Sequence, residues 1–397
     1  MDFKLLGSIL LIVGTSIGAG MLALPIATAQ LGFIGSIILL LICWFVMTMG
    51  AFLILEVNLW LPQNSNLISM AKVTIGPLGQ LVAWITYLLL LYSLLCAYIA
   101  GGSDLFHNLL NSNGIFIPAW TSALLFTLLF GFIVYLGIRA VDYVNRGLMF
   151  VKLGAYVLLI TLLTPFLDMV KLTSGEMKYL TSGAAMTVTI TSFGFATIVP
   201  SLRIYFASNV KKLKQAILIG SLIPLICYII WDMVIMGIIP LAGDHGLIAI
   251  LQSKTSTSDL VNTLNMLTAT SSSTFFAKLF TSICVVTSFL GVALCLTDFL
   301  ADGFHVEKTG LSNGCIHLLT FIPPFVIVLF FPNAFIKALQ YAGIYCVILL
   351  IMLPTVMAWY GRYRKKQVGE FKVAGGKKLL LFMMVFSFIV IAFNFFA

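Results

Sequence analysis

The sequence predicts an all-α polytopic membrane protein with eleven transmembrane helices, arranged as two inverted five-helix repeats plus one extra helix. The first observation is composition, since 61% of the 397 residues are hydrophobic and 9% are charged. Soluble domains contain about 25% charged residues, so this chain has too few polar side chains to cover a surface that faces water. The other two observations are the regular length of its apolar stretches and two glycine-rich interruptions. We expect a single transmembrane domain over residues 1–397.

Eleven stretches reach the length of about 20 apolar residues that a helix needs to cross a bilayer. The predicted spans are residues 5–29, 33–59, 79–105, 119–138, 148–170, 183–206, 215–240, 276–301, 313–331, 333–359 and 378–396. Turn-forming pairs separate several of them, for example Gly76 with Pro77 and Pro332 with Asn333. No small-residue cleavage site follows the first span, so we interpret it as a membrane helix and not as a secretory signal.

The basic residues predict the orientation of the chain. If the N-terminus is cytoplasmic, 17 of the 22 Lys and Arg residues lie on the cytoplasmic side and 5 lie on the outer side. Cytoplasmic loops carry the excess of Lys and Arg in membrane proteins, so we expect a cytoplasmic N-terminus and an outer C-terminus. The net charge of +9 then reflects topology and anionic lipid head groups, and we expect no nucleic acid partner.

Two predicted spans are interrupted near their middle. The first contains Gly-Thr-Ser-Ile-Gly-Ala-Gly at residues 14–20, followed by Pro25, and the sixth contains Thr-Ile-Thr-Ser-Phe-Gly-Phe at residues 189–195, followed by Pro200. Glycine and proline weaken the helical hydrogen-bond ladder, and unwound backbone at membrane depth must line a cavity enclosed by protein. Free N–H groups at the start of a half-helix suit a carboxylate, and free carbonyls at its end suit an ammonium group.

The spacing of the interruptions favours a binding site. They lie about 176 residues apart, each in the first helix of a five-span block, and the blocks cover residues 1–170 and 183–359 with residues 378–396 as the eleventh helix. Gly14 and Gly18 also form a helix-packing motif. However, paired interruptions at corresponding positions of inverted repeats are typical of secondary transporters, so we interpret both as parts of a substrate site.

Four segments together carry a family resemblance. They are GTSIGAGMLALP in the first span, the run from Leu53 to Val57 with Glu56, the run from Asp142 to Arg146 with Lys152, and TSFGF followed by VPS in the sixth span. In this order they resemble the hydroxy/aromatic amino acid permease family of the amino acid–polyamine–cation superfamily, most of all its bacterial tyrosine-transporting members. The resemblance implies proton-coupled import of an aromatic amino acid across the bacterial inner membrane, with a periplasmic C-terminus. Ala196 and Thr197 replace a His-Gly pair that is frequent in the family, which leaves tryptophan or phenylalanine as alternative substrates.

The resemblance also implies roles for individual residues. The substrate carboxylate would bind N–H groups of Gly18, Ala19 and Gly20, and the substrate amine would bind carbonyls near both interruptions. Phe195 would stack on or gate the substrate, and Tyr92 or Tyr98 either approaches its ring or packs between helices. The expected substrate-binding residues are Thr15, Ser16, Ile17, Gly18, Ala19, Gly20, Thr191, Ser192, Phe193, Gly194, Phe195, Tyr92 and Tyr98.

Ionisable residues within spans are few, so each is a candidate for ion coupling. Lys152 either extends to the inner interface or faces the first span, where sodium-coupled relatives hold sodium. Because burial disfavours the charged form of an ammonium group, a buried Lys152 can release and rebind a proton. Glu56 is expected to be a proton carrier or a partner of Lys152 or Arg146, whereas Asp232 has no partner nearby in the sequence.

The sequence also bears on alternative functions and on two further segments. A sodium symporter or exchanger of the same fold remains an alternative, with Thr287 and Ser288 as sodium ligands. The cysteines and histidines lack metal-ligand spacing, and neither a Walker loop, a catalytic pair nor a channel filter is present. We therefore expect a non-enzymatic protein with no metal, no cofactor and no obligatory protein partner. Residues 241–275 form either a loop or a lid, and residues 360–378 form a basic anchor.

Overall fold

The computed structural model describes residues 3–63, 65–206, 209–308, 310–331 and 334–396, and in these residues it is all-helical, without strands. The helices are α1 (Phe3–Ser16), α2 (Ala19–Ala27), α3 (Gly32–Leu59), α4 (Leu67–Thr74), α5 (Pro77–Ser112), α6 (Ala119–Tyr135), α7 (Ile138–Leu163), α8 (Gly183–Ser192), α9 (Val199–Tyr205), α10 (Val210–Ile238), α11 (Leu247–Gln252), α12 (Ser256–Thr268), α13 (Ser271–Phe304), α14 (Gly310–Phe330), α15 (Ala334–Cys346), α16 (Leu353–Trp359) and α17 (Gly376–Phe396). Short 3₁₀ segments lie at Ala29–Leu31, Thr164–Phe166, Lys171–Thr173, Met177–Thr181 and Gly194–Ile198 (η5), and π-helical segments lie at Val347–Met352 and Tyr360–Arg364.

The described helices account for ten candidate membrane spans. Nine are long and apolar enough by themselves, and α1 with α2 forms a tenth span that is bent by 51°. The apolar helix α6 corresponds to the predicted span at 119–138, but it has 17 residues and is shorter than the other spans. The predicted polytopic all-α class is therefore confirmed, whereas the count of eleven spans stays a prediction. The expected start of the tenth span at residue 333 and the break at 332–333 lie outside the described residues.

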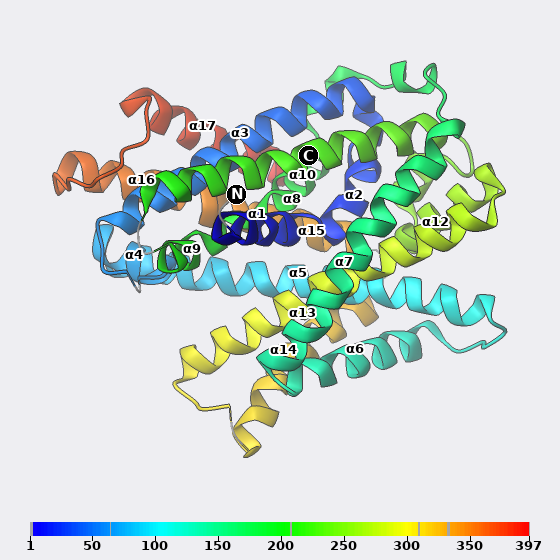
Figure 1. Cartoon of the computed structure of the whole chain (residues 1–397), viewed down its shortest axis with the longest axis horizontal. Coiled ribbons are helices and arrows are strands. Elements are labelled where there is room, and N and C mark those ends of the chain that lie inside the picture. Colours follow the sequence, from blue (N-terminus) through cyan, green and yellow to red (C-terminus); the bar gives the residue numbers. More distant parts are fainter. Residues whose placement is uncertain (1–2, 64, 207–208, 309, 332–333, 397) are drawn as a thin grey trace.

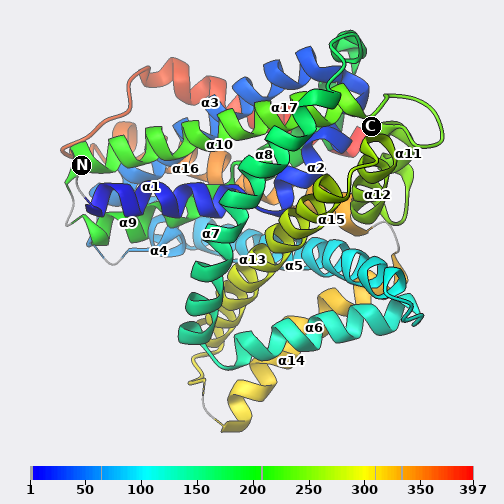
Figure 2. The same cartoon turned by 45° about the vertical axis from the view of Figure 1, so that its right-hand side comes forward.

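The helices form two groups that meet at the broken first span. Figure 1 shows α1, α3 and α10 in the upper half, and α5, α6, α13 and α14 in the lower half, with α7 crossing between them. Within the first group α10 packs against α1 and α3, and α2 packs against α8. Figure 2 shows from a second angle that α13 lies along α7 and α5. The two interrupted spans are thus enclosed by other helices.

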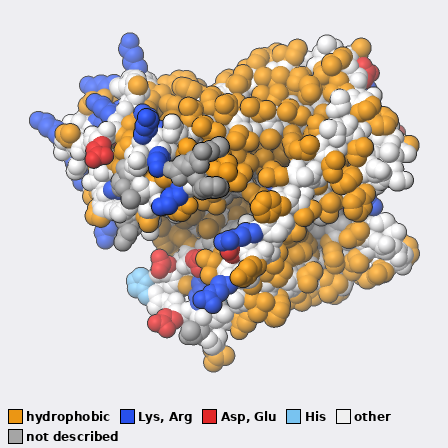
Figure 3. Space-filling view, in the orientation of Figure 1, with side chains coloured by type: hydrophobic (Ala, Val, Ile, Leu, Met, Phe, Trp, Pro, Cys, Tyr) orange, Lys and Arg blue, Asp and Glu red, His pale blue; other side chains and the backbone are white. Residues whose placement is uncertain are grey.

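Basic side chains gather at one end of the molecule. Figure 3 shows Lys and Arg at the left, where Figure 1 places α4, α9 and α16. We call this end the basic face, and it carries the basic residues of α4, of the start of α10 and of the chain after α16, namely Lys72, Lys211, Arg364 and Lys365. The long sides of the molecule in the same view are covered by hydrophobic side chains, which is the pattern expected where lipid surrounds the helices.

The segment 241–275, expected to be a loop or a lid, contains the two short helices α11 and α12. The helix α11 packs against α2, and α12 packs against α5 and α13. Asp104 of α5 accepts hydrogen bonds from the backbone N–H and the hydroxyl of Ser258, at 2.8 and 2.6 Å, and so caps the start of α12. The segment therefore packs over the helix ends that lie away from the basic face.

Candidate functional site

The first interruption is a sharp break between α1 and α2. The helix α1 ends at Ser16, and Gly18 adopts an extended conformation before α2 begins at Ala19. A side chain at Gly18 would place its Cβ atom 2.3 Å from Ser288 Oγ, so the Ser288 hydroxyl would have to move and give up its hydrogen bond with the N–H of Ala19. Glycine therefore allows the close approach of the first break to α13.

The second interruption is milder than the first. The helix α8 ends at Ser192, Phe193 follows, and η5 continues the span as a 3₁₀ segment before α9 begins. A Cβ atom added at Gly20 would lie 3.0 Å from Ser192 Oγ, which shows how closely the two interruptions pack against each other. The first span is broken where the sequence predicts it, whereas the sixth runs as one span over Gly183–Tyr205 with the 3₁₀ segment η5 at the predicted interruption.

Tyr228 of α10 connects the two interruptions. Its fully buried hydroxyl lies 2.6 Å from the carbonyl oxygen of Ser16 and 2.8 Å from that of Ser192, the last residues of α1 and α8. The carbonyls of Ser16 and Ser192 are among those expected to bind a substrate amine. In this structure they lie within hydrogen-bond distance of the Tyr228 hydroxyl. Sequence reasoning missed Tyr228, because a tyrosine within an apolar span carries no signal of a partner more than 200 residues away.

Lys152 lies at the end of α1. Its ammonium group donates to the carbonyl oxygen of Ile17 at 2.6 Å and lies 3.4 Å from Thr287 Oγ1, and the side chain is fully buried. The sequence left two positions open for the Lys152 side chain, one facing the first span and one extending to the inner membrane interface. The structure has the first of these. Lys152 therefore links α7, the first break and α13.

The first N–H group of α2 donates a hydrogen bond to a second hydroxyl of α13. Ser288 Oγ accepts a hydrogen bond from the backbone N–H of Ala19 at 3.1 Å. The sequence offered Thr287 and Ser288 as sodium ligands. In the structure Thr287 lies next to the ammonium group of Lys152, and Ser288 binds the N–H of Ala19. Among the described residues, no group of three or more His, Cys, Asp or Glu side chains is placed to hold a metal ion.

A cavity of about 260 Å³ lies beside these contacts, between α1, α5, α7, η5 and α13. Four of the expected substrate residues line it, namely Thr15, Tyr98, Thr191 and Gly194. Its wall also contains Thr287, Ser288 and a row of α5 residues spaced for one helix face, namely Tyr87, Leu91, Leu94 and Tyr98. Aromatic and apolar walls with a few polar groups are typical of a site for a small amphipathic ligand.

The other expected substrate residues lie around this cavity or away from it. Ile17, Gly18, Ala19, Gly20 and Ser192 belong to the buried interruptions described above. Phe193 and Phe195 are almost completely buried, and Phe193 packs edge-on against Tyr228 with ring centroids 5.2 Å apart. Tyr92 lies outside the cavity and donates to the carbonyl oxygen of Leu319 in α14 at 2.8 Å, which fits the helix-packing alternative. Tyr87, which sequence reasoning missed, lines the cavity in its place.

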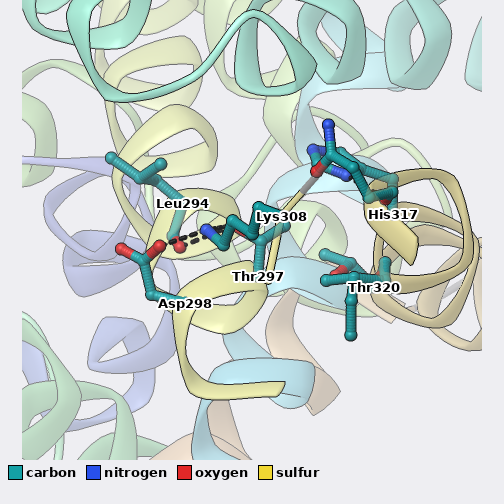
Figure 4. Close-up of polar contacts among 8 residues, drawn as sticks. Leu294, Thr297, Asp298, Lys308, His317 and Thr320 are labelled. Carbon is teal, nitrogen blue, oxygen red and sulfur yellow. Dashed lines mark hydrogen bonds and ion pairs between the residues drawn. The ribbon is translucent and has the colours of Figure 1, made fainter. Parts of the chain in front are cut away.

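The cavity continues toward the end of the molecule that carries the basic face. Tyr87 and Cys295 line both this cavity and a vestibule of about 760 Å³ at the end of α13. Figure 4 shows Lys308 pointing toward Asp298 in the vestibule wall, and the lysine also donates to Thr297 Oγ1 at 3.1 Å. The two cavities thus share part of one wall, while α11 and α12 pack over the helix ends that lie away from the basic face.

Glu56 has a partner that the sequence did not indicate. Both of its carboxylate oxygens bind Arg362, from Nε at 2.7 Å and from the NH2 group at 2.5 Å, and Val373 N–H adds a third bond at 2.7 Å. The two side chains are 1% and 3% exposed. Of the two roles expected for Glu56, the structure has pairing with a cation, but the cation is Arg362 and not one of the examples named from the sequence, since Arg146 binds Asp142 and Lys152 binds Ile17 O. The basic segment 360–378 was expected to be an anchor. Two of its residues, Arg362 and Val373, bind the buried Glu56 and so attach the segment to α3.

Asp232 lies one helical turn beyond Tyr228 on α10 and is fully buried. Its Oδ2 atom accepts from the Ser36 hydroxyl at 2.5 Å, and Ser36 Oγ lies 3.2 Å from the Thr28 hydroxyl at the end of α2. Within the described part of the chain, its Oδ1 atom has no hydrogen-bond partner. Asp232 therefore joins α10, α3 and the end of α2 through short polar side chains.

Comparison of the sequence with known proteins places the chain among amino acid permeases. The tryptophan/tyrosine permease family matches residues 1–394. The chain is 34% identical to Tyrosine-specific transport system 1 of Haemophilus influenzae, over 98% of this chain and 95% of that protein. It is 32% identical to the Tryptophan-specific transport protein of Pseudomonas aeruginosa, over 97% and 92%, and 30% identical to Glutamine transporter 2 of Aliivibrio fischeri, over 98% and 99%.

Proposed function

The chain belongs to the tryptophan/tyrosine permease family, and from this premise we propose that it imports an aromatic amino acid, with tyrosine favoured, by proton symport across the bacterial inner membrane. The observation that supports the proposal most is the buried ammonium of Lys152 at the carbonyl of Ile17. A titratable cation from α7 thus lies at the break of the first span, near a cavity with aromatic walls.

The cavity suits the two ends of an aromatic amino acid. Its apolar side, with Leu91, Leu94 and Tyr98, would take the aromatic ring. Its polar side borders the interruptions, where the N-terminus of α2 favours a carboxylate and the C-termini of α1 and α8 favour an ammonium group. Tyrosine is favoured over tryptophan and phenylalanine because two relatives, at 34% and 32% identity, are tyrosine-specific transport systems.

Proton coupling is favoured over sodium coupling by the partners of Lys152. A sodium ion bound to Thr287 and Ser288 would lie beside the ammonium group, which is 3.4 Å from Thr287 Oγ1, and two like charges repel at that distance. A proton on Lys152 supplies the same positive charge without a second cation. When the site opens to the cytoplasm, water reaches the ammonium group and the proton can leave.

The transport cycle would follow the two groups of helices. We propose that residues 1–170 and 183–359 are the inverted repeats, and that α1–α3 with α8–α10 rock against α5, α6, α13 and α14 around the central site. If the basic face is cytoplasmic, as the positive-inside rule favours, the vestibule beside Cys295 opens inward. The N-terminus then lies in the cytoplasm and the C-terminus in the periplasm.

The proposal can be tested by uptake of radiolabelled tyrosine into proteoliposomes, with proton and sodium gradients imposed separately. We expect accumulation with an inward proton gradient alone, and competition by unlabelled tyrosine, tryptophan and phenylalanine but not by glutamine. Liposomes without protein and proteoliposomes without a gradient are the controls. A requirement for sodium would move coupling to Thr287 and Ser288, and competition by glutamine alone would overturn the substrate class.

A further inference from the structure

The Tyr228 hydroxyl has more acceptors than it has protons. It lies 2.6 Å from Ser16 O and 2.8 Å from Ser192 O, and a phenol donates a single hydrogen. Ser16 O ends α1 at the sharp break, where it carries the partial negative charge of a helix C-terminus, and Ser192 O lies where α8 passes into η5. Buried carbonyls without a donor are costly, and the Tyr228 hydroxyl shares its one hydrogen between these two oxygens.

A substrate ammonium group is a better partner for the same two carbonyls. It carries three hydrogens and a full positive charge, and charge-assisted hydrogen bonds are stronger than neutral ones. An ammonium that enters from the adjoining cavity, whose wall contains Thr15 and Thr191 next to Ser16 and Ser192, would therefore replace the phenol. Tyr228 and the substrate amine compete for one pair of oxygen atoms.

We propose that Tyr228 is an internal substitute for the substrate amine. When the carrier returns without substrate, the Tyr228 hydroxyl holds the two interrupted spans together. This role rests on the proposed function, because a symporter must change its orientation twice in each cycle, once loaded and once empty. In the loaded carrier the substrate amine joins α1 to α8. In the empty carrier the Tyr228 hydroxyl makes this connection, so the empty form crosses with one donor hydrogen shared between the two buried carbonyls instead of none.

The proposal predicts that two transport modes respond differently to Tyr228→Phe. Net uptake needs the return of the empty carrier, whereas exchange of labelled for unlabelled substrate does not. We expect net uptake to fall by about tenfold or more because the unpaired carbonyls raise the barrier of the empty form, while exchange stays within about twofold of the wild type. The half-saturation concentration for exchange falls, because the substrate no longer competes with the phenol.

Tyr156→Phe is the matched control. The Tyr156 hydroxyl also donates to a backbone carbonyl, that of Cys227 at 2.9 Å, but this carbonyl lies within α10 and belongs to neither interruption. We expect the ratio of net uptake to exchange to stay at the wild-type value in this variant. A loss of net uptake and exchange in parallel in Tyr228→Phe, with the melting temperature unchanged, would overturn the proposal, and so would an unchanged ratio.

A second substitution keeps the shape of the ring. 3,5-Difluorotyrosine at position 228 is a stronger donor than tyrosine, so we expect a higher half-saturation concentration for exchange, opposite to Tyr228→Phe. An unchanged or lower value would contradict the competition between phenol and amine. The ratio of the two modes can be measured with whichever amino acid the wild type exchanges, so a wrong substrate assignment and a wrong role for Tyr228 give different results.

Discussion

The ammonium group of Lys152 lies 2.6 Å from the carbonyl oxygen of Ile17, the residue that follows the last turn of α1. The contact places a positive charge at the negative end of a half-helix, where it is stabilised by the helix dipole and by a charge-assisted hydrogen bond. Because Lys152 belongs to α7, its protonation state bears directly on how α7 and α1 pack together. This relationship is the physical basis of the proton coupling that we propose.

Substitution of Gly18 is expected to block the site without unfolding the protein. In Gly18→Val, the new Cβ atom would lie 2.3 Å from Ser288 Oγ, so the Ser288 hydroxyl must leave the N–H of Ala19 and the larger side chain fills the first break. We expect uptake to be abolished while the amount of protein in the membrane is unchanged. Gly7→Ala is the control, since a Cβ atom there meets nothing within 4 Å. Normal transport by Gly18→Val would remove the first break from the site.

The pair of Glu56 and Arg362 is expected to stabilise the fold. Glu56→Gln leaves a buried guanidinium without its counter-charge, which costs about 3–5 kcal/mol, so the melting temperature in detergent should fall markedly. Asp142→Asn removes the exposed pair with Arg146 and should change stability by less than about 1 kcal/mol. If residual uptake by Glu56→Gln lost its dependence on the proton gradient, Glu56 would have to be returned to the coupling pathway.

Substrate preference is expected to depend on Tyr98 and not on Tyr92. Tyr98 lines the cavity, whereas Tyr92 bonds to Leu319 in α14. Removal of one wall group changes discrimination by about 10–200-fold, so Tyr98→Leu should alter the ranking of tyrosine, tryptophan and phenylalanine in competition assays. Tyr92→Leu should leave the ranking unchanged, because Tyr92 lies outside the cavity. A change of ranking in the Tyr92 variant alone would place the substrate on the other side of α5.

Labelling of Cys295 is expected to reveal the direction in which the cavity opens. This exposed cysteine lines both the cavity and the vestibule. In a Cys315→Ser background, which removes the other exposed cysteine, a membrane-impermeant thiol reagent should label inside-out vesicles and not intact cells. Bound substrate should slow the reaction. Labelling of intact cells but not of inside-out vesicles would reverse the proposed orientation.

The hydrophobic pattern was sufficient to predict where the helices lie but not where they end. The predicted fifth span begins at residue 148, whereas α7 begins at Ile138, because its first turns contain Arg139, Asp142 and Arg146 and are helical but polar. The fourth span was predicted to reach residue 138, but α6 ends at Tyr135 before Gly137, whose φ of +92° ends the helix. Hydropathy therefore finds the apolar part of a helix and not its polar extensions.

The candidate site was predictable only where the backbone itself carries the signal. Glycine and proline in residues 14–20 indicated the break of the first span, and the family match confirms the resemblance found in the same motif. Tyr228 and the partner of Glu56 were missed because their contacts join residues between 36 and 306 positions apart. Such contacts depend on how the helices are arranged in space, which a single sequence does not contain.

The most direct test of the central claim is a measurement of proton movement that accompanies transport. Tyrosine is added outside proteoliposomes that contain a trapped pH dye, without an imposed gradient, for the wild type, Lys152→Met and Lys171→Met. Lys171 is a matched control because its ammonium also binds a backbone carbonyl, that of Ile238 at 2.6 Å, away from the breaks. We predict acidification of the interior by the wild type and by Lys171→Met, and tyrosine exchange without proton movement by Lys152→Met. Acidification by Lys152→Met at the wild-type ratio of protons to tyrosine would show that another group carries the proton.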